Sequence, residues 1–137
     1  MTDLPLTDLP LNIETIRPIG RSVRRGLHGC CPNCGKGQIF RAYLKVVDRC
    51  EACGEELYHH RADDAPAYVT LVIVCHFILA GVLASESVAP NSPFWVPALF
   101  WSALALASSM WILPHAKGAL IAMQWANRMH GFGGHLD

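Results

Sequence analysis

The chain has 137 residues, of which 52% are hydrophobic and 16% are charged, and its formal net charge is zero. This length is too short for two ordinary soluble domains, and the lack of a basic excess argues against a domain that binds nucleic acid. The charges are unevenly distributed, because between Ala65 and Pro114 only Glu86 is charged. We therefore expect a chain that is solvated at both ends and apolar in the middle.

The N-terminal region divides into an acidic part and a basic part. Residues 1–15 contain the pentamer TDLPL twice, and this mixture of prolines and acids predicts a flexible tail without a secretory signal. Residues 16–29 interleave arginines with apolar residues, which is typical of a segment lying on an anionic membrane surface. A solvated linker is the alternative interpretation of residues 16–29.

Two Cys-x-x-Cys-Gly motifs lie within residues 30–57, and fifteen residues separate the inner cysteines. The predicted metal ligands are Cys31, Cys34, Cys50 and Cys53. This spacing is typical of a zinc ribbon, in which four thiolates close a tetrahedral site and leave no position for a catalytic water. We therefore expect a structural Zn²⁺ in a small β module, with strands near Gln38–Phe40 and Tyr43–Val47. Iron, as in a rubredoxin-like electron carrier, is the alternative metal.

Other possible ligands flank this module. Cys30 directly precedes the first motif. We interpret it as a bystander, with an alternative ligand or a redox-sensitive thiol as the competing interpretations. His28, His59 and His60 are interpreted as solvated side chains, and a second metal site is the alternative for them.

Two apolar stretches predict a transmembrane hairpin over residues 65–113. As a helix, residues 65–85 reach about 31 Å, which matches a hydrocarbon core of about 30 Å. Residues 93–113 form the second span, with Trp95 and Trp111 near its ends, where interfacial aromatic residues occur. The predicted fold is a mainly α membrane protein, in which a two-helix transmembrane hairpin is preceded by a small β zinc ribbon.

The positions of the charged residues and of Pro114 predict the structure of the segments on either side of the hairpin. Residues 58–64 form a polar neck, and Pro114 is expected to end or kink the second helix. Residues 114–137 then form a short interfacial helix and a tail. All eleven Lys and Arg lie outside the loop of residues 86–92, so the positive-inside rule places both termini and the ribbon in the cytoplasm.

Two polar side chains lie near the middle of the first span. An ionisable residue at this depth is a functional candidate, so Cys75 and His76 are candidates for handling copper or haem, with Met110 as the nearest soft ligand on the second span. The simpler interpretation is a neutral His76 that bonds to Ser108 or Ser109 and holds the hairpin together.

Asp63 and Asp64 immediately precede the first span. Acids are favourable at a helix N-terminus, and Pro66 is compatible with the first turn, so helix initiation is a sufficient explanation for them. Binding of a partner's cation at the membrane surface is the alternative. Together with His76, these two acids are the predicted partner-binding residues.

Three blocks of sequence carry a resemblance that covers about residues 20–132. They are RGLHGCCPNCGKGQIFRAYLKVVDRCEACG, HHRADDAPAY and KGALIAMQWANRMHG. In this order they resemble a bacterial membrane family defined as a domain of unknown function, number nine-eight-three. Cys30 and Cys75 depart from the pattern of that family.

The resemblance implies a location in the bacterial inner membrane and a role in respiration. In many alphaproteobacteria, members of this family are encoded beside subunits and assembly factors of haem–copper cytochrome oxidase. We therefore expect an accessory subunit or assembly factor that acts through protein–protein contacts and the lipid bilayer. No enzymatic activity, nucleic acid or small-molecule substrate is expected, because the sequence contains no nucleophile–base pair and no phosphate-binding loop.

Overall fold

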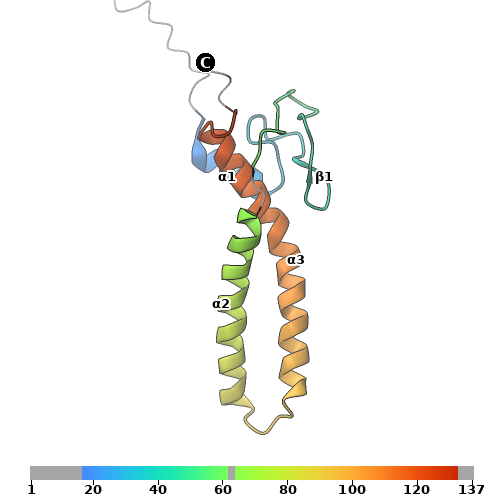
Figure 1. Ribbon diagram of the computed structural model, residues 1–137, viewed down its shortest axis with the longest axis vertical. Helices are drawn as coiled ribbons and strands as arrows, with labels where there is room; N and C mark the ends of the chain where they lie inside the picture. Colours follow the sequence, from blue (N-terminus) through green and yellow to red (C-terminus); the bar gives the residue numbers. More distant parts are fainter. Residues whose placement is uncertain (1–16, 62–63, 133–137) are drawn as a thin grey trace, which may run out of the picture.

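The computed structural model describes residues 17–61 and 64–132. The elements in chain order are α1 (Ile19–Leu27), β1 (Phe40–Ala42), β2 (Lys45–Val46), α2 (Ala65–Val88) and α3 (Trp95–Ala126). Helices α2 and α3 form a long hairpin, and α1 and the strands gather at its open end (Figure 1). We call residues 17–61 and 114–132 the head, and the hairpin of α2 and α3 up to Leu113 the shaft.

The shaft has the length and the surface of a transmembrane hairpin. Helix α2 has 24 residues and α3 has 32, so they reach about 36 and 48 Å at the rise of an α-helix. Both are long and apolar enough to cross a membrane. Large apolar side chains along them are exposed, such as Phe77 on α2 and Leu106 on α3. The predicted fold class is confirmed; the first predicted span falls inside α2, and the second begins two residues before α3.

The two helices of the shaft pack through small residues opposite a tryptophan. A methyl group at Gly81 would overlap the ring of Trp101, and the Trp101 Nε1–H donates to Ser85 Oγ at 3.3 Å. Gly81 and Ser85 lie on one face of α2 because they are four residues apart. The indole of Trp101 therefore occupies the space that these small residues leave, as is common where membrane helices approach closely.

Pro114 neither ends the second helix nor separates a further one from it. Helix α3 continues through Pro114 to Ala126, so the predicted interfacial helix is the end of the second span. Because proline has no N–H, the Met110 carbonyl loses its usual helical donor. The Tyr43 hydroxyl replaces that donor at 2.9 Å, and Lys117 Nζ donates to the Leu44 carbonyl at 2.8 Å. The turn between β1 and β2 therefore supports α3 beside its proline.

Residues 19–27 are helical and pack on α3, which excludes the alternative of a solvated linker for this part. Ser22 and Gly26 are the buried residues of α1. A methyl group on Gly26 would overlap the backbone of Gly118, and a methyl group on Gly118 would overlap the carbonyl of Gly26. The two backbones are therefore in direct contact. Arg17 fastens the start of this segment by donating to the carbonyls of Trp125 (2.8 Å) and Phe132 (2.9 Å).

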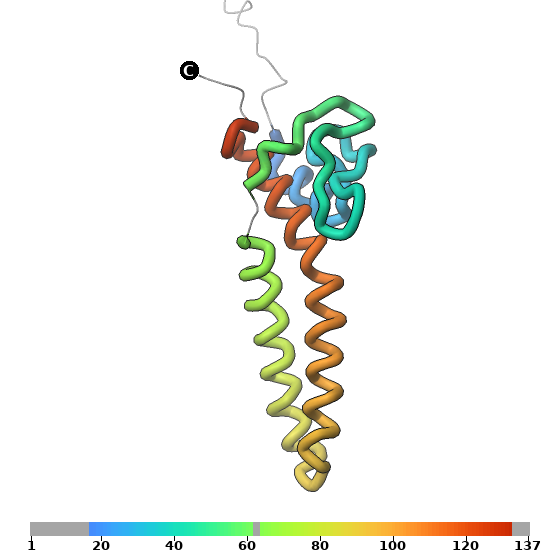
Figure 2. Tube along the Cα trace, turned by 45° about the vertical axis from the view of Figure 1, so that its right-hand side comes forward, coloured from blue at the N-terminus to red at the C-terminus, as the bar shows by residue number. Residues whose placement is uncertain are grey.

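The head has one hydrophobic core, and the end of α3 contributes to it. Its fully or nearly fully buried apolar residues come from the ribbon and from the segment after Pro114: Ile39, Leu57, Ile121, Trp125 and Phe132, together with Cys31 and Cys50. The ribbon and α1 both lie against the end of α3 (Figures 1 and 2). The ribbon is thus continuous in its packing with the second transmembrane helix and is not a separate module on a neck.

The neck is attached to α3 by one buried side chain. Gln124 accepts a hydrogen bond from the Arg61 N–H and donates one to the Arg61 carbonyl, each at 3.1 Å. Gln124 is 8% exposed, so both ends of its amide group are satisfied by the same backbone unit. This pairing fixes where the chain leaves the ribbon before it enters the membrane. The predicted tail of residues 1–15 lies outside the described residues.

Candidate metal centre

Two turns of similar geometry present the four cysteines. In the first, the Gly35 N–H donates to the Cys31 carbonyl at 2.9 Å, and in the second the Gly54 N–H donates to the Cys50 carbonyl at 2.9 Å. Both glycines have positive φ angles, 71° and 73°, a conformation that residues with a Cβ rarely adopt. Each Cys-x-x-Cys-Gly motif therefore folds into a tight turn because its glycine permits it.

Short strands hold these turns against each other. β1 pairs with β2 in antiparallel fashion, and two single bridges, Cys30 with Gln38 and Arg49 with Glu56, extend the pairing towards each turn. The predicted strand regions therefore contain the observed pairing, although the regular strands are shorter. The result is a ribbon in which two cysteines from each turn point to one centre.

The four sulfur atoms have the spacing of a tetrahedral metal site. All four lie within 4.8 Å of one another, and two cross-turn pairs, Cys31 with Cys53 and Cys34 with Cys50, are separated by 3.8 Å. A tetrahedral site with metal–sulfur bonds of about 2.3 Å has sulfur–sulfur edges of about 3.8 Å. A disulfide needs about 2.05 Å. The donor set therefore fits one metal ion bound by four thiolates, and it does not fit two disulfides.

The environments of the two sulfur atoms in the first turn differ. Burial raises the pKa of Cys31, which is fully buried. Burial also opposes the charged form of Cys34, but the N–H groups of Gly37 and Lys36 and the neighbouring sulfurs more than offset it, and they hold the pKa of this thiol at about 6. Four adjacent thiolates repel one another. A bound cation removes that repulsion and keeps all four deprotonated.

Several residues that support the site lie outside the two cysteine motifs, so the sequence did not single them out. A methyl group on Gly37 would overlap the sulfur of Cys50, so this position must be glycine for the turns to close. Arg25 of α1 donates to the carbonyls of Pro32 and Asn33 in the first turn. Because zinc with four thiolates has a net charge of about −2, a guanidinium beside the turn is electrostatically favourable. Neither contact could be found from local spacing.

Glu55 links the second turn to α3. Its carboxylate accepts a hydrogen bond from the Trp125 indole N–H at 2.8 Å and another from the Asn33 amide at 3.0 Å. Glu55 directly follows the glycine of the second motif, and Asn33 lies inside the first motif. One carboxylate therefore connects both turns of the metal site to the end of the second transmembrane helix.

The other candidate ligands near the ribbon do not join the site. Cys30 Sγ bonds to the His28 carbonyl at 3.7 Å, and His28 itself bonds to the Arg24 carbonyl. His59 contacts Glu56 at 3.3 Å, and His60 contacts the Leu57 carbonyl at 2.8 Å. Within residues 17–61 and 64–132, the four cysteines are the only cluster of His, Cys, Asp and Glu that is suited to a metal ion.

The predicted hydrogen bond between His76 and the second span is wrong. His76 Nδ1 bonds to the Val72 carbonyl of its own helix at 2.7 Å, and Ser108 Oγ donates to the Leu104 carbonyl at 2.7 Å and the Ala105 carbonyl at 3.1 Å. His76 is exposed, as are Cys75 and Met110. A polar side chain that does not face a partner helix can form its hydrogen bond with a backbone carbonyl of the preceding turn of its own helix.

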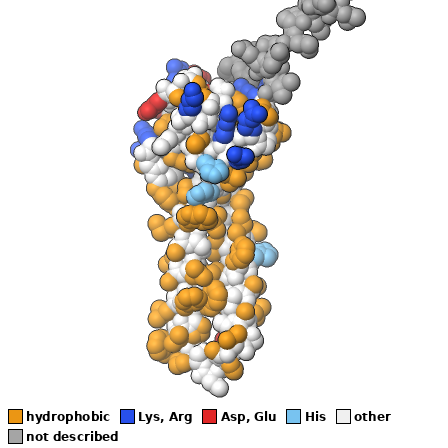
Figure 3. All heavy atoms as spheres, turned by 180° about the vertical axis from the view of Figure 1, so that it is seen from behind, with side chains coloured by type: hydrophobic (Ala, Val, Ile, Leu, Met, Phe, Trp, Pro, Cys, Tyr) orange, Lys and Arg blue, Asp and Glu red, His pale blue; other side chains and the backbone are white. Residues whose placement is uncertain are grey.

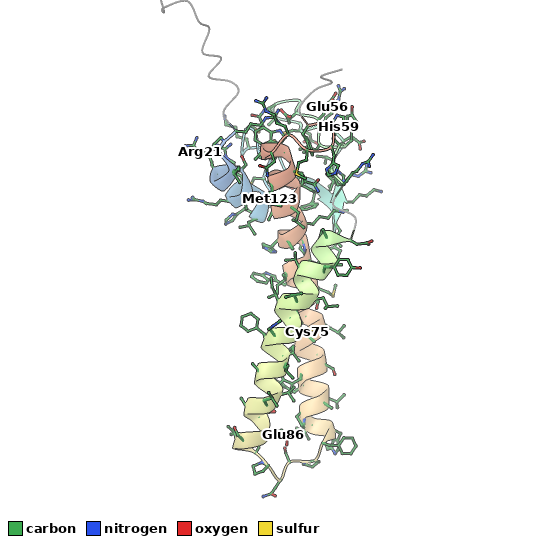
Figure 4. The ribbon with its side chains drawn as sticks, turned by 60° about the vertical axis from the view of Figure 1, so that its left-hand side comes forward. Arg21, Glu56, His59, Cys75, Glu86 and Met123 are labelled. Atoms are coloured by element: carbon green, nitrogen blue, oxygen red, sulfur yellow. The ribbon has the colours of Figure 1, made fainter. Side chains whose placement is uncertain are left out.

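The two acids at the start of α2 are only partly described. Asp64 occupies the N-cap position without a side-chain hydrogen bond to the helix, and it is exposed. Asp63 lies outside the described residues. Asp64 therefore lies at the end of α2 next to the head, whereas Cys75 lies in the middle of that helix (Figure 4). Of the three predicted partner-binding residues, the two that the structure describes, Asp64 and His76, lie twelve residues apart, about 18 Å along the helix axis, so they do not form one cluster.

Comparison with known proteins gives one match. A family model described as a protein of unknown function (DUF983) matches residues 40–125. The matched region contains the second cysteine motif, both membrane helices and the part of α3 that packs in the head, and it begins after the first motif. No curated protein and no solved structure matches the chain. Since the match extends over more than half of the sequence, the chain belongs to the DUF983 family.

Proposed function

We propose that this protein is a non-catalytic membrane adaptor whose head is held together by a structural Zn²⁺. Its partner would be a membrane-protein complex of the respiratory chain, with haem–copper cytochrome oxidase as the specific candidate. In this role the protein is an accessory subunit or an assembly factor. The proposal for the oxidase depends on the family resemblance, and the proposal for an adaptor depends on the geometry described above.

The observation that carries the adaptor role is the shared core of the head. Cys31 and Cys50 are buried in the same cluster as Ile121 and Trp125 of α3. A four-thiolate site has no open coordination position, so the metal would serve to keep the head folded. Because the head includes the end of the second span, the metal would also set the orientation of the head relative to the membrane.

The shaft supports lateral docking in the membrane. Its exposed apolar side chains include Leu79 and Leu83 on α2 and Leu99 and Leu106 on α3. A hairpin of two helices leaves most of this surface to lipid or to the helices of a partner. All eleven Lys and Arg are in the described head or in the segments that join it, and this distribution supports a cytoplasmic head in the bacterial inner membrane.

An electron carrier with iron is the alternative for the same four sulfur atoms. The spacing of the sulfurs suits iron as well as zinc. Protein purified from its own host in iron-sufficient medium distinguishes the two metals. A colourless protein with one zinc per chain supports the structural role, whereas a visible thiolate-to-iron charge-transfer band and stoichiometric iron would replace it with the carrier.

The adaptor proposal is tested by purification from native membranes. Tagged protein is solubilised in mild detergent, captured, and analysed by mass spectrometry and by a reduced-minus-oxidised haem spectrum. The variant Asp63→Asn with Asp64→Asn tests the membrane end of the head. The variant Asp48→Asn with Glu51→Gln is the matched control, since it removes the same charge from exposed positions of the ribbon.

The outcomes are distinct. Stoichiometric oxidase subunits with a-type haem would identify a subunit, and substoichiometric recovery with assembly factors would identify an assembly protein. In either case we expect the Asp63/Asp64 variant to lose the partner while it retains zinc, and the control to keep both. Recovery of neither oxidase subunits nor assembly factors, with zinc still bound, would refute the respiratory role.

A further inference from the structure

Helix α1 has three different surfaces. Its buried surface consists of Ser22 and Gly26, which face α3. Successive residues of an α-helix are rotated by about 100°, so Arg21, Arg24 and Arg25 fall on one side of α1. Ile19 and Leu27 lie towards the opposite side, where they are 50% and 40% exposed.

The cationic side of α1 borders a surface cavity that contains no acid. This cavity has a volume of about 420 Å³ and is lined by Gly20, Arg21, Arg24 and Arg25. An adjoining cavity of about 500 Å³ shares Arg21 and Arg25, and Glu55 is the single acid among its lining residues. That carboxylate already accepts hydrogen bonds from Trp125 and Asn33. The cavity lining therefore offers no acid to neutralise Arg21 and Arg24, whereas Arg25 is turned towards the first cysteine turn.

The side chains of two of these arginines have no hydrogen bond or ion pair within residues 17–61 and 64–132. They are Arg21 and Arg24, both exposed, and they differ in this from Arg17 and Arg25, which donate to backbone carbonyls of the head. Figure 4 shows that Arg21 lies on α1 at the outside of the head. Guanidinium groups in such a position are available to a phosphate.

The C-terminal end of α1 lies against the part of α3 that corresponds to the headgroup layer of a membrane. Gly26 touches Gly118, which is four residues beyond Pro114 and therefore about 6 Å further along α3. The polar layer on each side of a bilayer is about 5–8 Å thick. The end of α1 reaches down to the apolar boundary, because Leu27, His28, Pro114 and His115 line one small cavity.

The space-filling view shows the same arrangement. Lys and Arg side chains gather on the rear face of the head, histidines lie just below them, and the apolar surface of the shaft begins there (Figure 3). We propose that the side of α1 formed by Arg21, Arg24 and Arg25 binds the phosphate headgroup of an anionic phospholipid in the leaflet next to the head. The exposed Leu27, at the end of α1 nearest to Pro114, would meet the upper part of the acyl region.

Lipid binding to the purified full-length protein tests this site. The protein in detergent micelles is titrated with phosphatidylglycerol or with phosphatidylcholine, and bound lipids are counted by native mass spectrometry. The variants are Arg21→Gln, Arg24→Gln and the pair. The control is Arg41→Gln with Arg49→Gln, which removes two exposed charges from the ribbon. Zinc content is measured for each variant, and inorganic phosphate is added as a competitor.

We expect the unmodified protein and the control to prefer phosphatidylglycerol over phosphatidylcholine. Each single variant should weaken phosphatidylglycerol binding by about fivefold, and the pair by about 25-fold, since a basic residue near an anionic surface contributes about that factor. Equal affinity for both lipids, or equal weakening by the control, would overturn the proposal. Competition by inorganic phosphate without any preference between the lipids would show a general anion site instead.

Discussion

The hydroxyl of Tyr43 is expected to stabilise the protein only because Pro114 is present. Tyr43 donates to the Met110 carbonyl at 2.9 Å, and the residue that would normally supply this hydrogen bond in α3 is Pro114, which has no N–H. The change Tyr43→Phe removes the hydroxyl and little else. It leaves a carbonyl at the end of a membrane span without a partner.

We expect Tyr43→Phe to lower the free energy of unfolding by about 1 kcal/mol. A typical hydrogen bond in a protein contributes about 0.5–1.5 kcal/mol, and side-chain hydrogen bonds in a membrane protein average about 0.6 kcal/mol. The Met110 carbonyl has no helical alternative, which favours the upper part of this range. In a chain with Pro114→Ala the alanine N–H satisfies the carbonyl, so Tyr43→Phe should then cost close to zero.

A double-mutant cycle measures this coupling. The four zinc-loaded proteins are unfolded with SDS in mixed micelles, with tryptophan fluorescence as the signal, and the free energy of unfolding is compared. Tyr68→Phe is the control, because Tyr68 is 70% exposed on α2. If Tyr43→Phe costs the same with and without Pro114, the hydroxyl does not serve the carbonyl that the proline releases, and our account of the ribbon's contact with α3 is wrong.

Further changes test the packing and the metal separately. Gly118→Ala should destabilise the head by about 1–3 kcal/mol, because the new methyl group meets backbone that cannot move away easily. Thermal unfolding measures this change. Gly20→Ala is the control and should have no comparable effect, because its methyl group enters open space. Cys50→Ser should lower bound zinc from one per chain to almost none by elemental analysis, whereas Cys75→Ser should leave it unchanged. Gln124→Leu should cost about 1–3 kcal/mol by leaving the neck backbone unpaired, and limited proteolysis should then cut the neck faster.

The membrane spans and the cysteine cluster can be predicted because each depends on a pattern of residues that are close together in the chain. A span needs only a sufficient run of apolar residues, and a zinc ribbon needs two paired cysteines at a suitable separation with a glycine after each pair. In both cases the physical requirement acts on residues that are close together in the chain. The structure places Cys31, Cys34, Cys50 and Cys53 around one centre as expected.

The parts that sequence reasoning missed depend on contacts between distant segments. Gly26 and Gly118 meet backbone to backbone, but neither glycine is unusual in its own neighbourhood. Pro114 was expected to end or kink a helix on the basis of local propensity. The helix does not end there, because Tyr43, far away in the chain, supplies the missing donor, although α3 changes direction where it enters the head (Figures 1 and 2). Such compensation cannot be read from the residues around the proline.

The shared core changes what metal loss would mean for this protein. In an independent ribbon, loss of the metal would unfold a small module and leave the membrane anchor intact. Here Ile121 and Trp125 belong both to the core around the cysteines and to the helix that crosses the membrane. Removal of the metal would expose these side chains and release the contact between Glu55 and Trp125. A bound metal would therefore stabilise the end of α3 that lies in the head as well as the ribbon.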